Sequence, residues 1–142
     1  MKNIVKYIFI ALLSLELWSC QGADLWDQMP GEVKHFIDLY YPNSEIAEYS
    51  DTKNAYIVRL KNGPGFGFDT LCSWTWVNGY GMPIKEILIY DEVPEPLYTY
   101  LETFEQTGQV FILRRNSKIY EVSLLNDSLV YNISSEEVKV IR

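Results

Sequence analysis

Most of the stretch from Asp27 to Leu60 recurs in the chain at an offset of 64 residues, as between Asp27 and Asp91. Six residue pairs are identical at this offset, and like residues stand beside like between them: Asp27/Asp91, Pro30/Pro94, Tyr56/Tyr120, Val58/Val122, Leu60/Leu124 and Asn62/Asn126. A single offset maintained over this length indicates an internal structural repeat. The matched positions contain no catalytic or cofactor-binding constellation, so the repeat constrains the architecture and not the activity.

Each copy is predicted to begin with one amphipathic helix. The apolar residues of the two helices follow the spacing i, i+3, i+4, i+7: Val33, Phe36, Ile37 and Tyr40, then Leu97, Tyr100, Leu101 and Phe104. Asp27 and Asp91 precede the helix-opening prolines by three residues and are expected to cap the helices. Residues 78–92 connect the copies, and residues 84–90 fit a helical turn or a strand, of which we favour the helical turn.

Turn residues divide the rest of each copy into four strands. The expected strands are 46–49, 55–61, 65–69 and 73–77, then 110–113, 118–125, 128–132 and 137–141. The sequence therefore predicts an α+β fold of two layers, a tandem repeat of one helix plus antiparallel strands with the helices packed on one face of the sheet.

The faces of the strands follow from the turn lengths, because cross-strand partners point the same way. A three-residue turn, Thr70-Leu71-Cys72, places both Trp74 and Trp76 under the helices. A turn of two or four residues would instead place Trp74 over Gly67 and Trp76 over Gly65 on the open face. We predict the first register, with these inward residues: Tyr56, Val58, Leu60, Phe66, Phe68, Trp74, Trp76, Tyr120, Val122, Leu124, Leu129, Tyr131, Val138 and Val140.

The N-terminus has the pattern of an exported lipoprotein. Lys2 and Lys6 precede a short apolar run, as in a signal peptide over residues 1–19. Residues 17–20, Leu-Trp-Ser-Cys, resemble a bacterial lipobox, so we expect a lipid on Cys20 and a tether over residues 20–28. Ordinary cleavage near Ala23 is the alternative. With lipid on Cys20, Cys72 is a lone half-buried thiol; otherwise the two cysteines could form a disulfide.

Charge and composition exclude several function classes. The net charge is −7, and loss of Lys2, Lys6 and Glu16 with the signal peptide leaves 10 basic and 18 acidic residues, a net charge of −8. Nucleic acid is therefore not an expected partner. His35 is the only histidine and has no second ligand nearby, and the acidic pairs lack calcium-loop spacing. We expect no metal, no cofactor and no enzymatic activity.

The pattern of residues 29–46, 56–63 and 68–74 resembles the PepSY-like family of exported bacterial proteins. The motifs are Met-Pro-x-x-Val-x-x-Phe-Ile-x-x-Tyr-Tyr-Pro-x-x-x-Ile from Met29, Tyr-x-Val-x-Leu-x-Asn-Gly from Tyr56 and Phe-Asp-x-x-Cys-x-Trp from Phe68. The resemblance implies two repeats, 29–77 and 93–142, in one domain similar in fold to the β-lactamase inhibitor protein. It also implies binding or inhibition, without a defined target. Cys72 stands where glycine is usual, and Val138 where the second copy would have tryptophan.

The sequence thus favours a protein-binding module anchored by its N-terminal lipid and engaging another envelope protein. The expected docking surface is the open sheet face, whose outward residues include small side chains and two cations: Arg59, Lys61, Gly65, Gly67, Ser73 and Thr75. The alternative is a module that senses a small ligand or envelope stress. A deep pocket between the repeats would favour that alternative.

Overall fold

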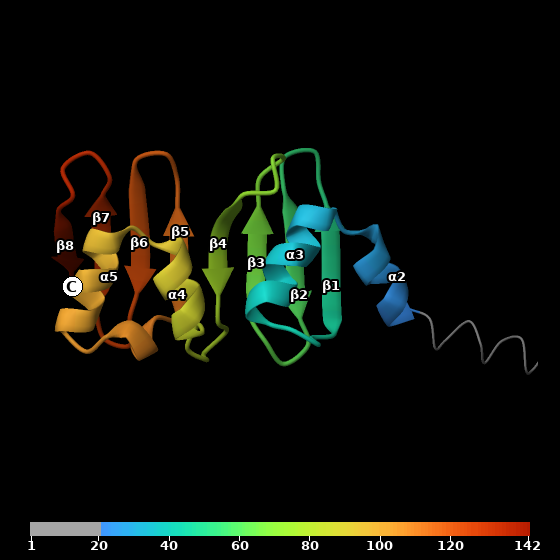
Figure 1. Cartoon of the computed structure of the whole chain (residues 1–142), viewed down its shortest axis with the longest axis horizontal. Helices are drawn as coiled ribbons and strands as arrows, with labels where there is room; N and C mark the ends of the chain where they lie inside the picture. Colours follow the sequence, from blue (N-terminus) through green and yellow to red (C-terminus); the bar gives the residue numbers. More distant parts are fainter. Residues whose placement is uncertain (1–20) are drawn as a thin grey trace, which may run out of the picture.

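The computed structural model describes residues 21–142, with side chains from Leu25 onward. Its strands form one antiparallel sheet in the sequential order β1 to β8, and the helices lie on one face of it (Figure 1). The first half comprises α2 (Gln21–Gln28), α3 (Gly31–Tyr40), β1 (Ile46–Asp51), β2 (Tyr56–Leu60), β3 (Gly65–Phe68) and β4 (Trp74–Asn78). The second comprises α4 (Glu86–Glu92), α5 (Glu95–Thr103), the 3-10 turn η1 (Thr107–Gln109), β5 (Ile112–Arg115), β6 (Ile119–Ser123), β7 (Ser128–Asn132) and β8 (Val138–Ile141). The predicted two-layer α+β fold is confirmed.

The two halves share one sheet, because β4 pairs with β5. They also share one core, to which α3 contributes Val33 and Ile37 and α5 contributes Leu97 and Leu101, all buried. Phe36 of α3 packs edge-on against Phe66 and Phe68 of β3, with ring centroids 5.9 and 5.4 Å apart. The helical spacing seen in the sequence is therefore the spacing that buries one side of each helix on the sheet.

The connector contains a helix, as predicted, since α4 occupies Glu86–Glu92 and buries Leu88 and Ile89. The capping role of Asp27 and Asp91 is wrong. Asp27 lies inside α2, and Asp91 lies inside α4. The N-cap positions of α3 and α5 are instead occupied by Pro30 and Pro94, without a side-chain hydrogen bond. A helix that begins with proline has one fewer free N–H to satisfy, so it needs the aspartate less.

The expected tether is helical over Gln21–Gln28. Leu25 and Trp26 pack against the core, and α2 contacts the edge strand β1. Burial of these two side chains explains why the segment folds onto the body. It also covers one of the two edges of the sheet. Within the described residues, no helix combines the length and the hydropathy that a membrane span requires.

The turn between β3 and β4 has the predicted three residues. Cys72 adopts a left-handed conformation with φ of 64° despite not being glycine. The Asp69 carboxylate accepts hydrogen bonds from the backbone N–H groups of Leu71 and Ser73, at 2.9 and 3.0 Å. These bonds help to offset a conformational cost of roughly 1–2 kcal/mol. Burial, with Glu32 and Asp69 nearby, raises the pKa of the Cys72 thiol, which lowers its thiolate population. Its pairing with Cys20 lies outside the described residues.

A β-bulge in β4 corrects the predicted face of one tryptophan. Phe68 pairs with Trp74, but Gly67, which precedes Phe68 in β3, pairs with Trp76. Thr75 is therefore the extra residue of β4. Trp74 remains under the helices, whereas Trp76 lies on the open face and Val77 takes the inward position opposite Phe66. Neither the predicted register nor the rival register describes this strand, because a bulge reverses the alternation partway along it.

Two smaller differences arise at strand ends. The fifth strand begins at Ile112, because the Val110 carbonyl accepts a hydrogen bond from Ile84 of the connector instead. Val138 and Val140 occupy inward register positions on β8, yet Val140 is 44% exposed. Strand β8 is the second edge of the sheet, and in Figure 1 its outer side has no neighbouring element. Inward orientation therefore does not bring full burial there.

Candidate functional site on the open sheet face

The sheet brings together three of the six predicted docking residues. Arg59 of β2 pairs with Gly65 of β3, and Gly67 lies on the same strand and face. Thr75 lies one strand away at the bulge. Lys61 and Ser73 are separate from this group: Lys61 is exposed beyond the end of β2, with its Nζ 3.4 Å from Glu45, and Ser73 is exposed in the β3–β4 turn.

The expectation of a shallow surface at the glycines is wrong, because Gly65 and Gly67 are buried. A methyl group added at Gly67 would overlap the indole nitrogen of Trp76. At Gly65 it would lie 2.9 Å from the Tyr80 ring and 3.4 Å from the far edge of the Trp76 indole. The indole thus spans both glycines. Glycine in this strand serves the close approach of an aromatic ring from the same chain.

Trp76, Tyr80 and Arg59 form what we call the aromatic ridge. The Arg59 guanidinium carbon lies 4.6 Å from the centroid of the Tyr80 ring, within cation–π distance. The Arg59 side chain also approaches Glu48 at 4.0 Å, a distance at which an exposed ion pair contributes little. Tyr80 follows β4 and has a positive φ of 50°, and its N–H donates to Asn78 Oδ1 at 2.8 Å. This turn places the half-exposed Tyr80 ring back over β3.

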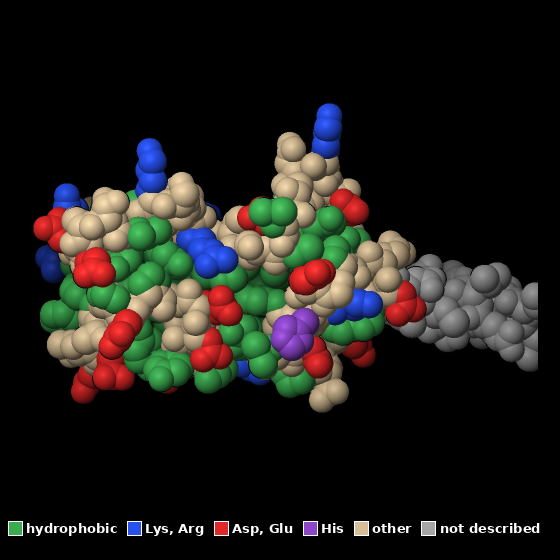
Figure 2. All heavy atoms as spheres, turned by 45° about the horizontal axis from the view of Figure 1, so that its top comes forward, with side chains coloured by type: hydrophobic (Ala, Val, Ile, Leu, Met, Phe, Trp, Pro, Cys, Tyr) green, Lys and Arg blue, Asp and Glu red, His purple; other side chains and the backbone are tan. Residues whose placement is uncertain are grey.

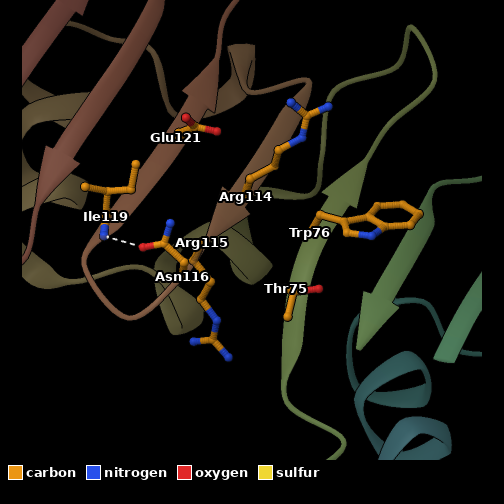
Figure 3. Close-up of a pocket in the computed structure, with 7 residues that line it drawn as sticks. All are labelled: Thr75, Trp76, Arg114, Arg115, Asn116, Ile119 and Glu121. Atoms are coloured by element: carbon orange, nitrogen blue, oxygen red, sulfur yellow. Dashed lines mark hydrogen bonds between the residues drawn. The ribbon is translucent and has the colours of Figure 1, made fainter. Parts of the chain in front are cut away.

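Beside the ridge, two adjoining hollows follow β4 and β5, and we call them together the trench. The first has a volume of about 290 Å³ and is lined by Thr75, Trp76, Arg114, Arg115, Asn116, Ile119 and Glu121 (Figure 3). The second has about 220 Å³ and is lined by Trp76, Asn78, Tyr80, Ile112 and Arg114. Because both are lined by Trp76 and Arg114, these two residues mark the middle of the trench. It lies where the two halves of the sheet meet.

Cross-strand register explains the surroundings of Arg114. Arg114 of β5 pairs with Trp76 on one side and with Glu121 of β6 on the other, so the three lie in one row on the open face. Arg115 points the opposite way from Arg114 in Figure 3. Its Nε donates to the Trp74 carbonyl oxygen at 2.7 Å, and its guanidinium lies 4.0 Å from the Trp74 ring centroid. The two adjacent arginines therefore serve opposite faces of the sheet.

A carboxylate holds the helix face together at the same junction. Glu92 of α4 accepts hydrogen bonds from the Tyr40 hydroxyl and the Trp74 indole N–H, each at 2.7 Å. Burial, with the hydrogen bond to Glu92, raises the pKa of Tyr40, so the phenol stays protonated and donates. Lys85 adds a bond from its Nζ to the Tyr40 carbonyl at 2.9 Å. We call Glu92, Tyr40 and Trp74 the junction cluster.

The charges of the two faces differ. From Glu86 to Thr103, the helices α4 and α5 contain five acidic residues and no lysine or arginine. Carboxylates and the exposed His35 are visible in the view of Figure 2, which keeps the helix side in sight. The open face instead presents Arg59 and Arg114 beside Glu48 and Glu121. An anionic group would therefore meet less repulsion on the open face than on the helices.

Sequence reasoning missed Trp76, Tyr80 and Arg114 as residues of this surface, although the alternation of the sixth strand does place Glu121 on the open face. One signal was present, since glycines at alternate positions of a strand indicate that a bulky group approaches the backbone. No local sequence pattern indicated the bulge that places the Trp76 side chain on the open face. Arg114 and Glu121 were ordinary polar residues of separate strands in the second copy, and the pairing of β4 with β5 brings Arg114 next to Trp76.

The fold and the site define the class: a two-layer α+β protein with one sheet face covered by helices and the other bearing a trench that is centred on Trp76 and Arg114. In residues 21–142, no group of three or more His, Cys, Asp or Glu side chains is placed to hold a metal ion. Aromatic rings and guanidinium groups suit recognition by stacking, hydrogen bonding and charge.

No family model matches the chain, and no curated protein matches it. Solved structures do. A DUF2874-family protein of Bacteroides vulgatus, described as periplasmic, is 23% identical, with a TM-score of 0.68 over 82% of this chain and 93% of that one. A Bacteroides thetaiotaomicron protein is 24% identical, with a TM-score of 0.69 and the same coverages. Another B. vulgatus protein, described as periplasmic and of unknown function, is 16% identical, with a TM-score of 0.66 over 82% and 94%. These similarities establish a shared fold.

Proposed function

We propose that this protein is a non-enzymatic, exported binding or inhibitor-type lipoprotein that engages another envelope protein through the open face of its sheet. The observation that carries the proposal is the aromatic ridge beside Arg114. Trp, Tyr and Arg are the residues most enriched among those that dominate binding energy in protein interfaces. Here they are preorganised, because Trp76 lies on the glycines of β3 and Arg59 stacks on Tyr80.

Two further observations support the proposal. The motifs from Met29 resemble the PepSY-like family, whose fold is similar to that of a protein inhibitor, and helices cover only one face of the sheet. All three of these structurally similar proteins are described as periplasmic, in agreement with the signal peptide expected here. The B. thetaiotaomicron protein is also described as calcium-regulated. The proposed site of this chain offers no cluster of acidic ligands for calcium, because Glu121 is the one acidic residue among those that line the trench.

A small-ligand or envelope-stress sensor is the second candidate. The trench lies between the repeats, as that candidate requires, but its two hollows, of about 290 and 220 Å³, are open to solvent along the sheet face. Pockets for small molecules usually enclose the ligand and bury most of its surface. A shallow trench beside protruding aromatic side chains fits a protein partner better.

The double variant Arg59→Glu with Thr75→Arg is expected to lose capture of the partner. Arg59 belongs to the ridge and Thr75 lines the trench, but neither is part of the buried core, so the unfolding midpoint should change by no more than about 2 °C. Reversed and added charge in a docking surface should weaken binding by at least about tenfold. The measurement is a pull-down of envelope proteins on the immobilised mature chain, with thermal unfolding of each variant.

The matched control is Lys53→Glu with Thr99→Arg, which makes the same charge changes at exposed positions away from the site. The control should retain the protein that the wild type captures. Capture that survives in the folded Arg59→Glu, Thr75→Arg variant would exclude the open face, and loss in both variants would show a general effect of charge instead.

The lipid anchor has its own test. Cys20 lies outside the described residues, and the proposal for it rests on the lipobox-like residues 17–20. Cys20→Ser removes the only thiol that the lipid could modify there, so the protein should move from the membrane fraction to the soluble envelope fraction. Cys72→Ser serves as the control and should remain with the membrane. A Cys20→Ser protein that still sediments with membranes would refute lipid anchoring.

A further inference from the structure

We infer that the trench binds a short extended segment of the partner, with one carboxylate on Arg114 and an apolar side chain beside Trp76. This inference rests on the proposed function and specifies the chemistry of the same site. It assigns a central role to Arg114, which neither the repeat nor the motif pattern indicated.

Arg114 differs from the other arginines of the described residues in having no internal partner. Arg59 stacks on Tyr80 and approaches Glu48, Arg115 is bound to the Trp74 carbonyl, and Arg142 lies 3.7 Å from Asp127. Arg114 is exposed, and within residues 21–142 no carboxylate lies within 4.0 Å of it. An arginine offers five N–H donors in a planar arrangement that matches a carboxylate. Its donors are thus available to a ligand at the centre of the trench.

The shape of the trench favours an extended chain. Its two hollows follow one another along β4, one ending near Thr75 and Ile119 and the other near Asn78 and Ile112. Thr75 and Asn78 are three residues apart, which corresponds to roughly 10 Å along a strand. An extended ligand of three or four residues would cover this distance. Successive side chains would then point alternately into the trench and away from it.

The lining also limits what that segment can carry. Ile119, Ile112 and Trp76 are partly buried and offer apolar surface on both sides of Arg114. Glu121 lies opposite Arg114 in the adjacent strand, so a second carboxylate would be repelled. Asn116 is already engaged, since its Oδ1 accepts from the N–H groups of Lys118 and Ile119 at 2.8 and 3.0 Å. The preferred segment therefore has one carboxylate between apolar residues, not a run of acidic ones.

The test uses the mature chain, residues 20–142 with Cys20→Ser, labelled with ¹⁵N. It is titrated with three blocked five-residue peptides: one with a central glutamate between two leucines, the same peptide with glutamine, and one with three consecutive glutamates. We expect saturable shifts of the Trp76 indole N–H and no shift of the buried Trp74 indole N–H. The single-glutamate peptide should bind at least about tenfold more tightly than either of the others.

Arg114→Gln should abolish the preference for glutamate over glutamine, while Lys139→Gln, farther along the same cross-strand row, should preserve it. Equal binding of the glutamate and glutamine peptides, or a preference that survives in Arg114→Gln, would overturn the inference. So would the absence of Trp76 shifts at millimolar peptide. The proposed function has a separate test: the Arg59→Glu, Thr75→Arg variant should lose partner capture while its control retains it. That result would support the proposed function even if the peptides failed to bind, so failure of the inference and failure of the proposed function are distinguishable.

Discussion

Replacing Trp74 with alanine is expected to lower the free energy of unfolding by about 3–5 kcal/mol, the usual cost of truncating a large core side chain. Trp74 is 3% exposed and packs edge-on against Tyr120, with ring centroids 6.2 Å apart. Its indole N–H donates to Glu92, and Arg115 covers its ring. The variant therefore loses core volume and a member of the junction cluster at once. Urea unfolding followed by far-UV circular dichroism measures the effect.

Trp76→Ala is the matched control, because the same residue type stands two positions along the same strand on the other face. Trp76 is partly exposed and rests on the backbone of Gly67, so its truncation should cost about 1–2 kcal/mol. Equal losses at the two positions would contradict the bulge, since an unbulged strand would put both indoles on the same face. Trp74→Phe should be intermediate, because it keeps most of the apolar contact but loses the donor.

Replacing Glu92 with alanine is expected to destabilise the fold by about 2–4 kcal/mol. The change leaves the Tyr40 hydroxyl and the Trp74 indole N–H without their acceptor, and both side chains are 3% exposed. An unsatisfied buried donor costs roughly 1–3 kcal/mol, and partial access of water to the half-buried Glu92 position reduces the sum. The same urea titration measures this loss.

Glu102→Ala removes a carboxylate from an exposed position of α5 and should change stability by no more than about 0.5 kcal/mol. Glu92→Gln keeps one acceptor oxygen and should lie between the wild type and Glu92→Ala. Because Glu92 and Trp74 share a hydrogen bond, the double variant with Trp74→Phe should cost less than the two single changes combined. Strict additivity would mean that this bond contributes nothing to the fold.

The junction cluster explains why the two repeats behave as one structure. Tyr40 comes from the helix of the first half, Trp74 from its last strand and Glu92 from the connector helix. Arg115, from the first strand of the second half, contacts the cluster at Trp74. Each hydrogen bond of Glu92 therefore crosses from the connector to the first repeat, and the Arg115 contacts join β5 to β4. Loosening this cluster should weaken the alignment of β4 with β5, on which the trench depends.

The sequence by itself determined the repeat, the fold class and most of the inward residues. These features follow from short-range patterns: a period of 3.6 in helices, a period of 2 in strands and turn residues between them. Val33 and Ile37 on α3, and Val58 and Leu60 on β2, are buried as the periods predict. Even the three-residue turn at Cys72 was predicted, because that length keeps Phe68 and Trp74 on the same, inward face.

Only the tertiary structure decided which side chains meet on the open face. The bulge at Thr75 turns Trp76 outward, because Val77 fills the inward place opposite Phe66 and the glycines of β3 leave room for an indole on the other side. Arg114 reaches Trp76 through the pairing of β4 with β5, across more than 30 residues of intervening chain. Local sequence encodes the periodicity of strands, but it does not reveal which side chain has room to pack on which face of the sheet. The space available in the folded protein determined where the residues of the trench lie.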